Sequence, residues 1–362
     1  MDNIPIAKPD IEKQDIDAVV TCLKSGNISA GLKSEEFESR FAQELGVGLC
    51  RSVNSGTTAL RIAIRALGIE KGSEVIVPDM SFAATAHAVV LEGLVPVFCD
   101  VGLDGLIDEE LIKDKISSKT RAVLVVHLHG ICAKIDRIKS LCEKKRIFLI
   151  EDCAQAFGSS FKGKPVGSFG ITSAFSLYAT KNITTGEGGM VCFNDSKLAE
   201  RVSLWIDNGR FRGEEIKAEG DNLRMSDINA ALGISQLGKY KRMQEKRKVI
   251  AKAYNSKLAG IRSIILPTEP GEYDNVYHHY NIVFKNGIVY SEAKEFFRSK
   301  GISIKRYYPC ALSECPPFSL KPQKNSSFLA KNSFCIPIYS AMPKTHIKRV
   351  AEAAKQYVRR LG

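Results

Sequence analysis

The sequence lacks several features that would place it in whole classes of protein. It has no apolar run long enough to cross a membrane, so no membrane partner is expected. Residues 1–5 lack the basic-then-apolar pattern of a secretory signal peptide. None of the ten cysteines forms a C-x-x-C pair, and no internal repeat is visible. These absences predict a cytoplasmic protein with no metal site.

The cysteines themselves point to the same compartment. Most lie in apolar segments that are typical of strands or helices, as expected for free thiols in a reducing environment. The two nearest in sequence are Cys310 and Cys315, with four residues between them. This spacing alone gives little support to a metal or redox role.

The chain carries a formal net charge of +12, which raises the question of an acidic partner. Its lysines and arginines are scattered, and no basic motif is interleaved with aromatic residues, so nucleic acid is not expected. An anionic metabolite is the other partner that a positive balance favours, and a generally basic surface is the plainer interpretation.

What is present is the composition of a globular protein, with 44% hydrophobic and 25% charged residues. A length of 362 residues favours two domains. Continuous apolar segments rich in β-branched residues predict strands that are buried on both faces of a mostly parallel sheet. These segments are residues 74–78, 95–98, 121–126 and 147–150. Amphipathic helices such as residues 135–145 lie between them, which indicates an open α/β sheet.

The regular alternation of predicted strands and helices ends after about residue 194. A long helix is predicted over residues 225–258, a strand over 280–284, a helix over 291–300 and a last helix near the C-terminus. The polar stretch 321–327 predicts a surface loop. We therefore expect a large domain over residues 1–242, whose N-terminal segment could pack on the other domain, and a smaller α+β domain over 243–362.

Ligands of open α/β sheets bind at the carboxyl ends of the strands, and three motifs fall at such ends. The first, residues 54–60, follows a strand and opens a helix with Gly56 and Thr57. Free backbone N–H groups at a helix N-terminus favour an anion such as a phosphate. An ordinary helix cap explains the same residues equally well.

The second motif places Glu151 and Asp152 after an apolar strand. A carboxylate there can pair with a protonated ring nitrogen, although a structural salt bridge is an equal alternative. The third motif places Lys181 between a strand and a glycine-rich turn, among small and hydroxyl-bearing neighbours. Most lysines are surface residues, but an amine whose pKa is lowered by burial becomes a nucleophile toward an aldehyde.

The order of these motifs resembles the DegT/DnrJ/EryC1/StrS family of sugar aminotransferases, which depend on pyridoxal 5'-phosphate (PLP) and have the fold-type I architecture. The resemblance covers nearly the whole chain. It includes residues 4–9, 25–31, 37–38, 74–82, 158–170, 176–189, 222–227 and 307–309. The fold that it implies is α/β, with a mostly parallel seven-stranded sheet and a smaller α+β C-terminal domain.

The resemblance also implies a role for each matching residue. Lys181 would hold the cofactor as a Schiff base, the internal aldimine, and then act as general base and acid. Asp152 would pair with the pyridinium nitrogen, Gln155 would lie near the ring hydroxyl, and Phe82 would stack on the ring.

Further residues would hold the cofactor phosphate. These are Ser176, with the backbone at Gly56 and Thr57. Asn222 would reach the phosphate of the neighbouring subunit, so that a homodimer shares its active sites.

The activity implied is transfer of an amino group from glutamate to a keto group of a nucleotide-linked sugar, in a ping-pong reaction. Alternatives within the family are a free cyclic ketone as acceptor, or a sugar dehydratase, in which a histidine replaces the lysine. A non-catalytic PLP-fold regulator would have lost residues that this chain keeps.

Some positions leave the substrate open. Ala179 and Phe82 depart conservatively from the family pattern, whereas Ser313 stands where many members carry a histidine. For the carboxylates of the amino donor, Arg224, His278 and His279 are possible contacts, and the two histidines are as readily structural.

Overall fold

The computed structural model describes residues 3–211, 215–267 and 271–361. A seven-stranded sheet lies at its centre, and β9 alone in this sheet runs antiparallel to its neighbours. In spatial order the strands are β1 (Leu49–Val53), β9 (Gly189–Phe193), β8 (Thr172–Ser176), β5 (Phe148–Asp152), β4 (Thr120–Val126), β2 (Glu74–Pro78) and β3 (Val95–Cys99). The predicted α/β class with a mostly parallel sheet is confirmed.

Strand β5 ends later than its sequence predicted. The apolar run stops at Ile150, but the strand continues through Glu151 and Asp152, which pair with β4 and β8. Successive strand residues point to opposite faces of a sheet. The two acids are therefore directed to different sides, and both are buried.

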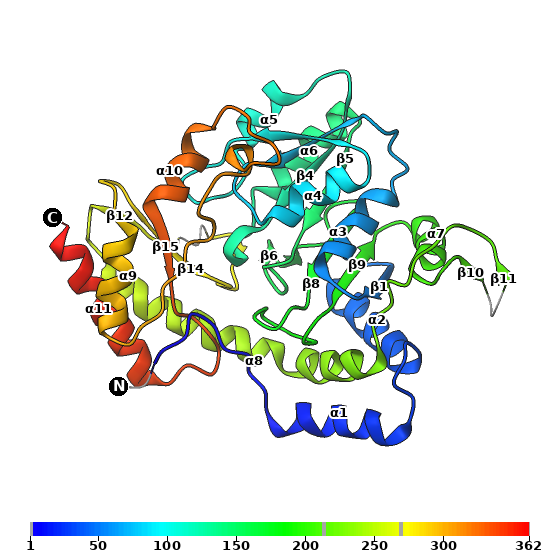
Figure 1. Cartoon of the computed structure of the whole chain (residues 1–362), viewed down its shortest axis with the longest axis horizontal. Coiled ribbons are helices and arrows are strands. Elements are labelled where there is room, and N and C mark those ends of the chain that lie inside the picture. The colour runs from blue at the N-terminus through cyan, green and yellow to red at the C-terminus, as the bar shows by residue number, and fades with distance from the viewer. Residues whose placement is uncertain (1–2, 212–214, 268–270, 362) are drawn as a thin grey trace.

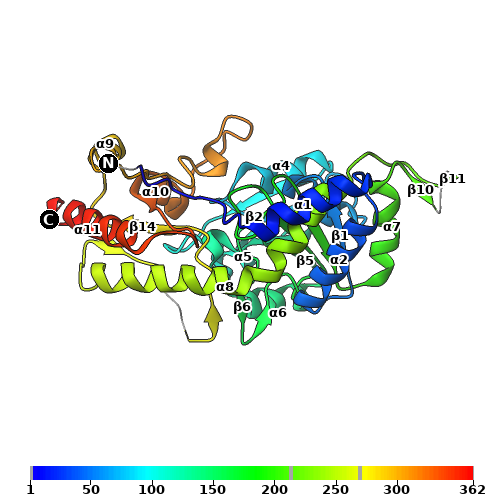
Figure 2. The same ribbon diagram turned by 90° about the horizontal axis from the view of Figure 1, so that it is seen from below.

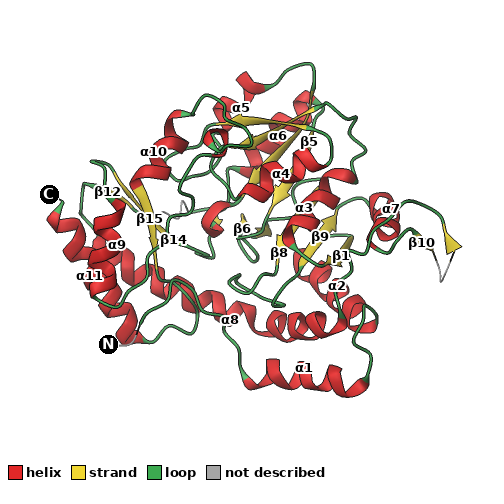
Figure 3. Cartoon of the chain, in the orientation of Figure 1, coloured by secondary structure: helices red, strands yellow, loops and turns green. Residues whose placement is uncertain are grey.

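Helices surround this sheet (Figure 3). Helix α3 packs across β8 and β9, α4 contacts β2 and β3, and α6 lies beside β5. The helices that precede α8 (Asp227–Leu258) in the chain are α1 (Lys13–Ser25), α2 (Leu32–Leu45), α3 (Gly56–Arg65), α4 (Ala83–Leu91), α5 (Glu109–Lys115), α6 (Ile135–Lys145) and α7 (Ser196–Ile206). Two small sheets are separate from the seven-stranded sheet. One has three strands, β13 (Tyr273–Asp274), β6 (Ser160–Phe161) and β7 (Lys164–Pro165), and the other pairs β10 (Arg210–Phe211) with β11 (Glu215–Ile216).

Helix α8 (Asp227–Leu258) connects the two halves of the molecule, and α1 runs alongside it (Figure 1). It begins two residues later than predicted because Ser226 caps it by accepting a hydrogen bond from the amide of Asn229. Met243 of α8 packs in the core around the large sheet, whereas Ile250 and Tyr254 pack in a second core. Figure 2 shows the helix extending from one region to the other.

The second core surrounds a small antiparallel sheet of β12 (Ile264–Ile265), β14 (Tyr280–Phe284) and β15 (Ser333–Ile336). Helices α9 (Tyr290–Ser299) and α11 (Lys344–Arg360) pack here. Ile4, from the opposite end of the chain, is fully buried in the same cluster. Its amide donates to the carbonyl of Gly301 at 2.8 Å.

The prediction of a surface loop over residues 321–327 is wrong in its second half. Helix α10 (Lys324–Asn332) begins there, and Ser326 is fully buried. Its hydroxyl donates to Asp79 at 2.6 Å, and the amides of Asn325 and Ser326 donate to Asp100 at 2.9 Å. The buried carboxylates of Asp79 and Asp100 thus hold residues 325–326 and keep Ser326 in the interior, although the polar composition of this segment predicted a surface position.

No helix in the described part of the chain combines the length and apolar character that crossing a membrane requires.

Candidate active site

Lys181 lies just beyond β8, in a turn that closes on the backbone. Its amide donates to the carbonyl of Tyr178 at 2.9 Å, and the amide of Leu177 donates to Gly188 at 2.9 Å. Burial lowers the pKa of the Lys181 ammonium to about 8, although the charge of Asp152 opposes the shift. About a tenth of the amine is therefore neutral at pH 7, far more than for an ordinary lysine, and the neutral form is the nucleophile.

Asp152, at the end of β5, is the carboxylate that acts on Lys181. It is buried, and it accepts hydrogen bonds from the Thr85 hydroxyl at 2.9 Å and the Ala154 amide at 3.1 Å. Burial raises the pKa of Asp152, and these two donors and the Lys181 charge offset only part of that shift. The site thus holds a carboxylate that a nearby cation would stabilise.

Glu151 faces the other side of the sheet, and donors from the chain surround its carboxylate. Its oxygens accept hydrogen bonds from the amides of Gly167, Phe169 and Gly170 at 2.6–2.8 Å. His127 Nε2 lies 3.1 Å away. Burial alone would raise the pKa of Glu151, but these donors more than reverse it and lower the pKa. Of the two predicted acids, Glu151 therefore fixes a loop and Asp152 faces the site.

Gln155 links the segment after β5 to Tyr308, far along the chain. Its Oε1 accepts from the His129 amide at 2.7 Å, and its Nε2 donates to the Tyr308 hydroxyl at 2.9 Å. The Tyr308 ring lies 5.9 Å from the ring of Phe82, which is 57% exposed at the start of α4. One wall of the site is therefore aromatic and open to a flat ligand.

The N-terminus of α3 meets β8 at the far side of the site. A Cβ on Gly56 would lie 2.6 Å from Ser176 Cβ, so only glycine allows this approach. Ser55 is the N-cap and accepts from the Thr58 amide at 3.1 Å. The helix-cap interpretation is therefore correct for Ser55. The Gly56 and Thr57 amides at the start of the helix, beside the Ser176 hydroxyl, have the character of an anion cradle.

Comparison with known proteins agrees with this arrangement. The sequence pattern of the DegT/DnrJ/EryC1/StrS aminotransferase family matches residues 9–355. The chain belongs to this family. It is 36% identical over 262 residues to a GDP-perosamine synthase of Vibrio cholerae, which covers 71% of each chain.

Solved structures of aminotransferases match over nearly the full length. The Helicobacter pylori aminotransferase PseC, described as involved in the biosynthesis of pseudoaminic acid, has a TM-score of 0.95 at 27% identity, covering 99% of this chain and 100% of its own. A sugar aminotransferase of Streptococcus pneumoniae, solved in its PLP form, has a TM-score of 0.94 at 26% identity, covering 99% and 100%. The predictions of a PLP-dependent aminotransferase and of its cofactor are confirmed.

The residues of this aminotransferase fit PLP. The cradle at Gly56 suits a phosphate, Lys181 suits the aldehyde, and Asp152 suits a protonated ring nitrogen. Asn182, which follows Lys181, has a buried side-chain Nδ2 that lacks a hydrogen-bond partner among the described residues. An unsatisfied donor beside the reactive amine is consistent with a polar ligand in this space.

Asn222 stands apart from this cluster. It is exposed, its amide donates to Asp221 Oδ1 at 2.7 Å, and its backbone bridges to Asp207. None of the contacts within the described residues joins its side chain to Lys181 or Asp152. The structure therefore does not bring Asn222 into the site of its own subunit, and its role remains a prediction.

The three candidate contacts for donor carboxylates have other partners. Arg224 forms an ion pair with Asp207, and His278 Nδ1 lies 3.1 Å from Asn182 Oδ1. His278 and His279 are both buried, and burial lowers the pKa of each well below its ordinary value. Neutral histidines suit a structural role better than a carboxylate contact. Ser313, the other open position, is buried and donates to Asp79 Oδ2 at 2.9 Å.

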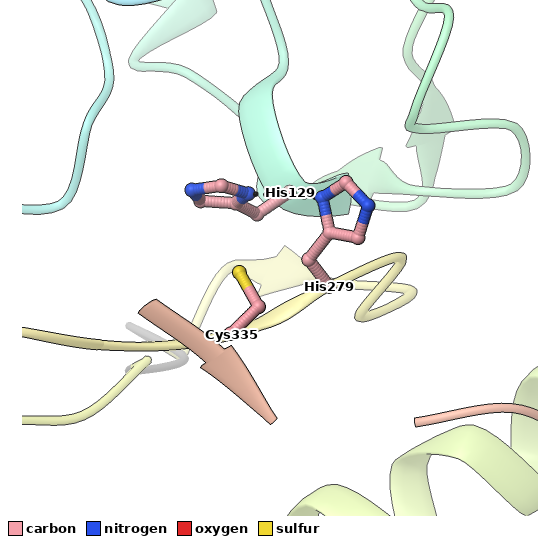
Figure 4. A group of neighbouring side chains, drawn as sticks. All are labelled: His129, His279 and Cys335. Carbon is pink, nitrogen blue, oxygen red and sulfur yellow. Dashed lines mark hydrogen bonds between the residues drawn. The ribbon is translucent and has the colours of Figure 1, made fainter. Parts of the chain in front are cut away.

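His129, whose amide donates to Gln155, belongs to a buried cluster with His279 and Cys335 (Figure 4). His129 Nδ1 lies 3.2 Å from His279 Nδ1, and the sulfur of Cys335 lies within 4.8 Å of both rings' nitrogens. Burial lowers the pKa of His129 to about 4 and the pKa of His279 well below its ordinary value, so both imidazoles are neutral and one Nδ1 donates a hydrogen bond to the other. Tyr307 stacks on His279 at 3.9 Å, which fixes the residue before Tyr308.

Sequence reasoning missed several of these residues. Thr85 lies outside the matched segments, Asn182 has no signal beyond its place after Lys181, and His129 and His279 are 150 residues apart in the sequence. Tyr308 could have been found, because it lies in the segment 307–309 that resembles the family.

Proposed function

We propose that this aminotransferase transfers an amino group from glutamate to a keto carbon of a nucleotide-linked sugar, in two half-reactions. The observation that carries the chemistry is the pairing of a half-buried Lys181, whose pKa is lowered to about 8, with the buried carboxylate of Asp152. The nucleotide-linked acceptor is supported by the relative named GDP-perosamine synthase. The net charge of +12 suits an acceptor with a diphosphate.

PLP supplies an electron sink for the carbanion that forms when the substrate loses a proton. Asp152 holds a negative charge at the site and so favours protonation of the ring nitrogen. When it is not bound to the cofactor, the Lys181 amine would be placed to take up and return the proton of the substrate carbon as general base and acid. Gln155 and Tyr308 would hold the edge of the PLP ring, and Phe82 would lie over its face.

The decisive test measures both half-reactions of the purified holoenzyme. With glutamate alone, the absorbance of bound PLP should convert to that of the pyridoxamine form, with one 2-oxoglutarate released per site. A panel of 3-keto and 4-keto nucleotide sugars should then restore the original spectrum. Restoration only by free cyclic ketones would replace the proposed acceptor, and no conversion with glutamate would overturn the proposed donor.

We further propose that the enzyme is a homodimer in which Asn222 serves the neighbouring subunit's cofactor phosphate. Asn222 is exposed, and no contact within the described part of the chain joins its side chain to Lys181 or Asp152, as expected for a residue that acts in trans. Helix α1 also exposes Ile16 (56%), Val20 (39%) and Leu23 (51%). Apolar residues grouped on one helix are typical of a subunit interface.

Subunit mixing tests the shared site. An inactive Lys181→Ala chain and an inactive Asn222→Ala chain are combined and allowed to exchange. Shared sites give hybrids with one intact site, so activity should partly return. Activity that stays absent after exchange, or a monomer in sedimentation, would contradict the proposal. The free thiols of the chain support a cytoplasmic location for this enzyme.

A further inference from the structure

Two cysteine sulfurs meet in the loop that follows Tyr308. Cys310 Sγ and Cys315 Sγ are 2.7 Å apart, closer than the van der Waals contact of two unbonded sulfurs and longer than a disulfide bond of about 2.05 Å. Both side chains are half-buried, so solvent reaches them. The four residues between them in sequence did not predict this proximity.

We propose that Cys310 and Cys315 are a thiol modification site that forms a reversible disulfide with small disulfides such as oxidised glutathione. The Cys310 thiolate attacks one sulfur of the reagent, and one glutathione leaves as a thiolate that takes up a proton. Cys315 then loses its proton and attacks the Cys310 sulfur of the mixed disulfide, releasing the second glutathione. The two protein thiols are oxidised by two electrons, and the reagent is reduced to two thiols.

The order of attack follows from the surroundings of the two thiols. Burial, together with a hydrogen bond to Cys310, raises the pKa of Cys315 to about 12. Its sulfur also donates to the carbonyl of Ala311 at 3.3 Å. Cys315 is therefore held as a thiol and is assigned the second step, in which it attacks the mixed disulfide.

A second pair provides an internal comparison. Cys50 and Cys192 face each other across β1 and β9, and their sulfurs are 2.6 Å apart. Both are almost completely buried, at 0% and 1% exposure. The distance between the sulfurs is therefore nearly the same in the two pairs, but only Cys310 and Cys315 are partly exposed to solvent. A reagent that must contact a sulfur should distinguish them.

The loop is anchored on both sides of Cys310, which determines what the disulfide would do. Before it, Tyr308 bonds to Gln155 at the active site. After it, the amides of Leu312 and Ser313 donate to Asp79 at 2.8 and 2.7 Å. Because the sulfurs already lie near bonding distance within this anchored loop, the disulfide would lock the present conformation and keep Tyr308 in place.

The test treats the native holoenzyme with oxidised glutathione, blocks remaining thiols under denaturing conditions, and analyses tryptic peptides by mass. Peptide 307–324 contains Cys310 and Cys315 and no other cysteine. We expect this peptide to lose two hydrogen masses and to escape alkylation, and dithiothreitol should reverse both changes. The peptides that contain Cys50 and Cys192 should be alkylated throughout.

Two outcomes would overturn the proposal. One is a peptide 307–324 that stays alkylated at both cysteines or carries glutathione on each. The other is equal oxidation of the Cys50–Cys192 pair, which would show that exposure does not select the site. As a matched variant, Cys310→Ser should acquire at most one glutathione at Cys315.

Hydrogen exchange measures the consequence independently of activity. In the oxidised enzyme the amides of residues 308–315 should exchange at least several-fold more slowly, while transamination stays within about twofold of the reduced enzyme. The Cys310→Ser variant should show no such slowing after the same treatment. Faster exchange in the oxidised wild type would mean that the disulfide distorts the loop, contrary to the proposal.

Discussion

Glu151 and Asp152 are neighbours on β5, and they show how one strand serves two purposes. The carboxylate of Glu151 accepts three backbone hydrogen bonds from the 167–170 loop, and its pKa is lowered. The carboxylate of Asp152 accepts one hydroxyl and one amide, and its pKa is raised. Both side chains are buried, so burial alone does not separate them.

The difference lies in how completely each charge is satisfied within the chain. A saturated carboxylate gains little from a further cation, so Glu151 holds structure. A buried carboxylate with few donors is stabilised by a nearby cation, and Asp152 is such a carboxylate. Substitutions on the Asp152 face should therefore lower activity, whereas a substitution of Glu151 should lower stability.

The largest effect on the Asp152 face is expected from Lys181→Ala. This variant should abolish transamination, because no other amine among the described residues is placed beside Asp152 to form the covalent link. PLP could still bind without that link, and the protein should remain folded. Lys181→Arg, which keeps the positive charge but not the nucleophile, is the matched control and should be equally inactive. Full turnover of either purified variant without added amine would contradict the role of Lys181.

Asp152→Asn should lower kcat by about 100-fold or more, equivalent to roughly 3 kcal/mol or more in barrier. An amide cannot supply the charge that favours a protonated ring nitrogen. Thermal stability should change little, because the substitution removes a buried charge with few partners. Steady-state kinetics and a melting curve measure the two quantities, and a rate within tenfold of wild type would argue against the assignment.

In contrast to Asp152→Asn, Glu151→Gln should lower stability and leave activity nearly unchanged. The side-chain NH₂ would confront backbone N–H groups that now donate to a carboxylate, so we expect a loss of about 2–4 kcal/mol in unfolding free energy. The kcat of the folded variant should stay within a few-fold of wild type. Denaturant unfolding and kinetics on the same sample check this. A variant that kept its stability and lost its activity would reverse the roles of the two acids.

The same substitution predicts a dependence on pH. Because the folded-state pKa of Glu151 is lowered, its contribution to stability is present at neutral pH and is lost as pH falls through that lowered value. The difference in unfolding free energy between wild type and Glu151→Gln should therefore shrink below the ordinary pKa range of glutamate.

The sequence predicted much of this architecture because apolar periodicity is a local signal. Strand β2, strand β14 and helix α6 have the predicted bounds or nearly so. The sequence could not divide the roles of Glu151 and Asp152, since the donors to Glu151 come from the 167–170 loop. It also assigned Ser326 to a loop because the two carboxylates that bury this segment lie more than two hundred residues earlier.

The site residues also divide into those with a local sequence signal and those that depend on contacts between distant segments. The motif order was enough to select Lys181, Gly56 and Ser176, which the fold brings to one edge of the sheet. Thr85 was not selected, because a hydroxyl at the start of a helix is usually a cap. Its bond to Asp152 joins two elements that are 67 residues apart.

Thr85→Val provides the smallest and most specific test of the comparison. Valine has nearly the shape of threonine but removes the hydroxyl that donates to Asp152 Oδ2 at 2.9 Å. With one donor fewer, Asp152 should be harder to ionise, and its hold on the protonated ring should weaken. A hydrogen bond to a charged group contributes about 1.5–3 kcal/mol, so kcat/KM should fall by about tenfold.

Thr85→Ser retains the hydroxyl and should stay within about twofold of wild type. The diagnostic readout is the pH profile of kcat/KM, whose acidic limb should move to higher pH in Thr85→Val and not in Thr85→Ser. If both variants lose activity equally with unchanged profiles, Thr85 acts through packing alone, and Asp152 does not depend on its few donors in the way that distinguishes it from Glu151.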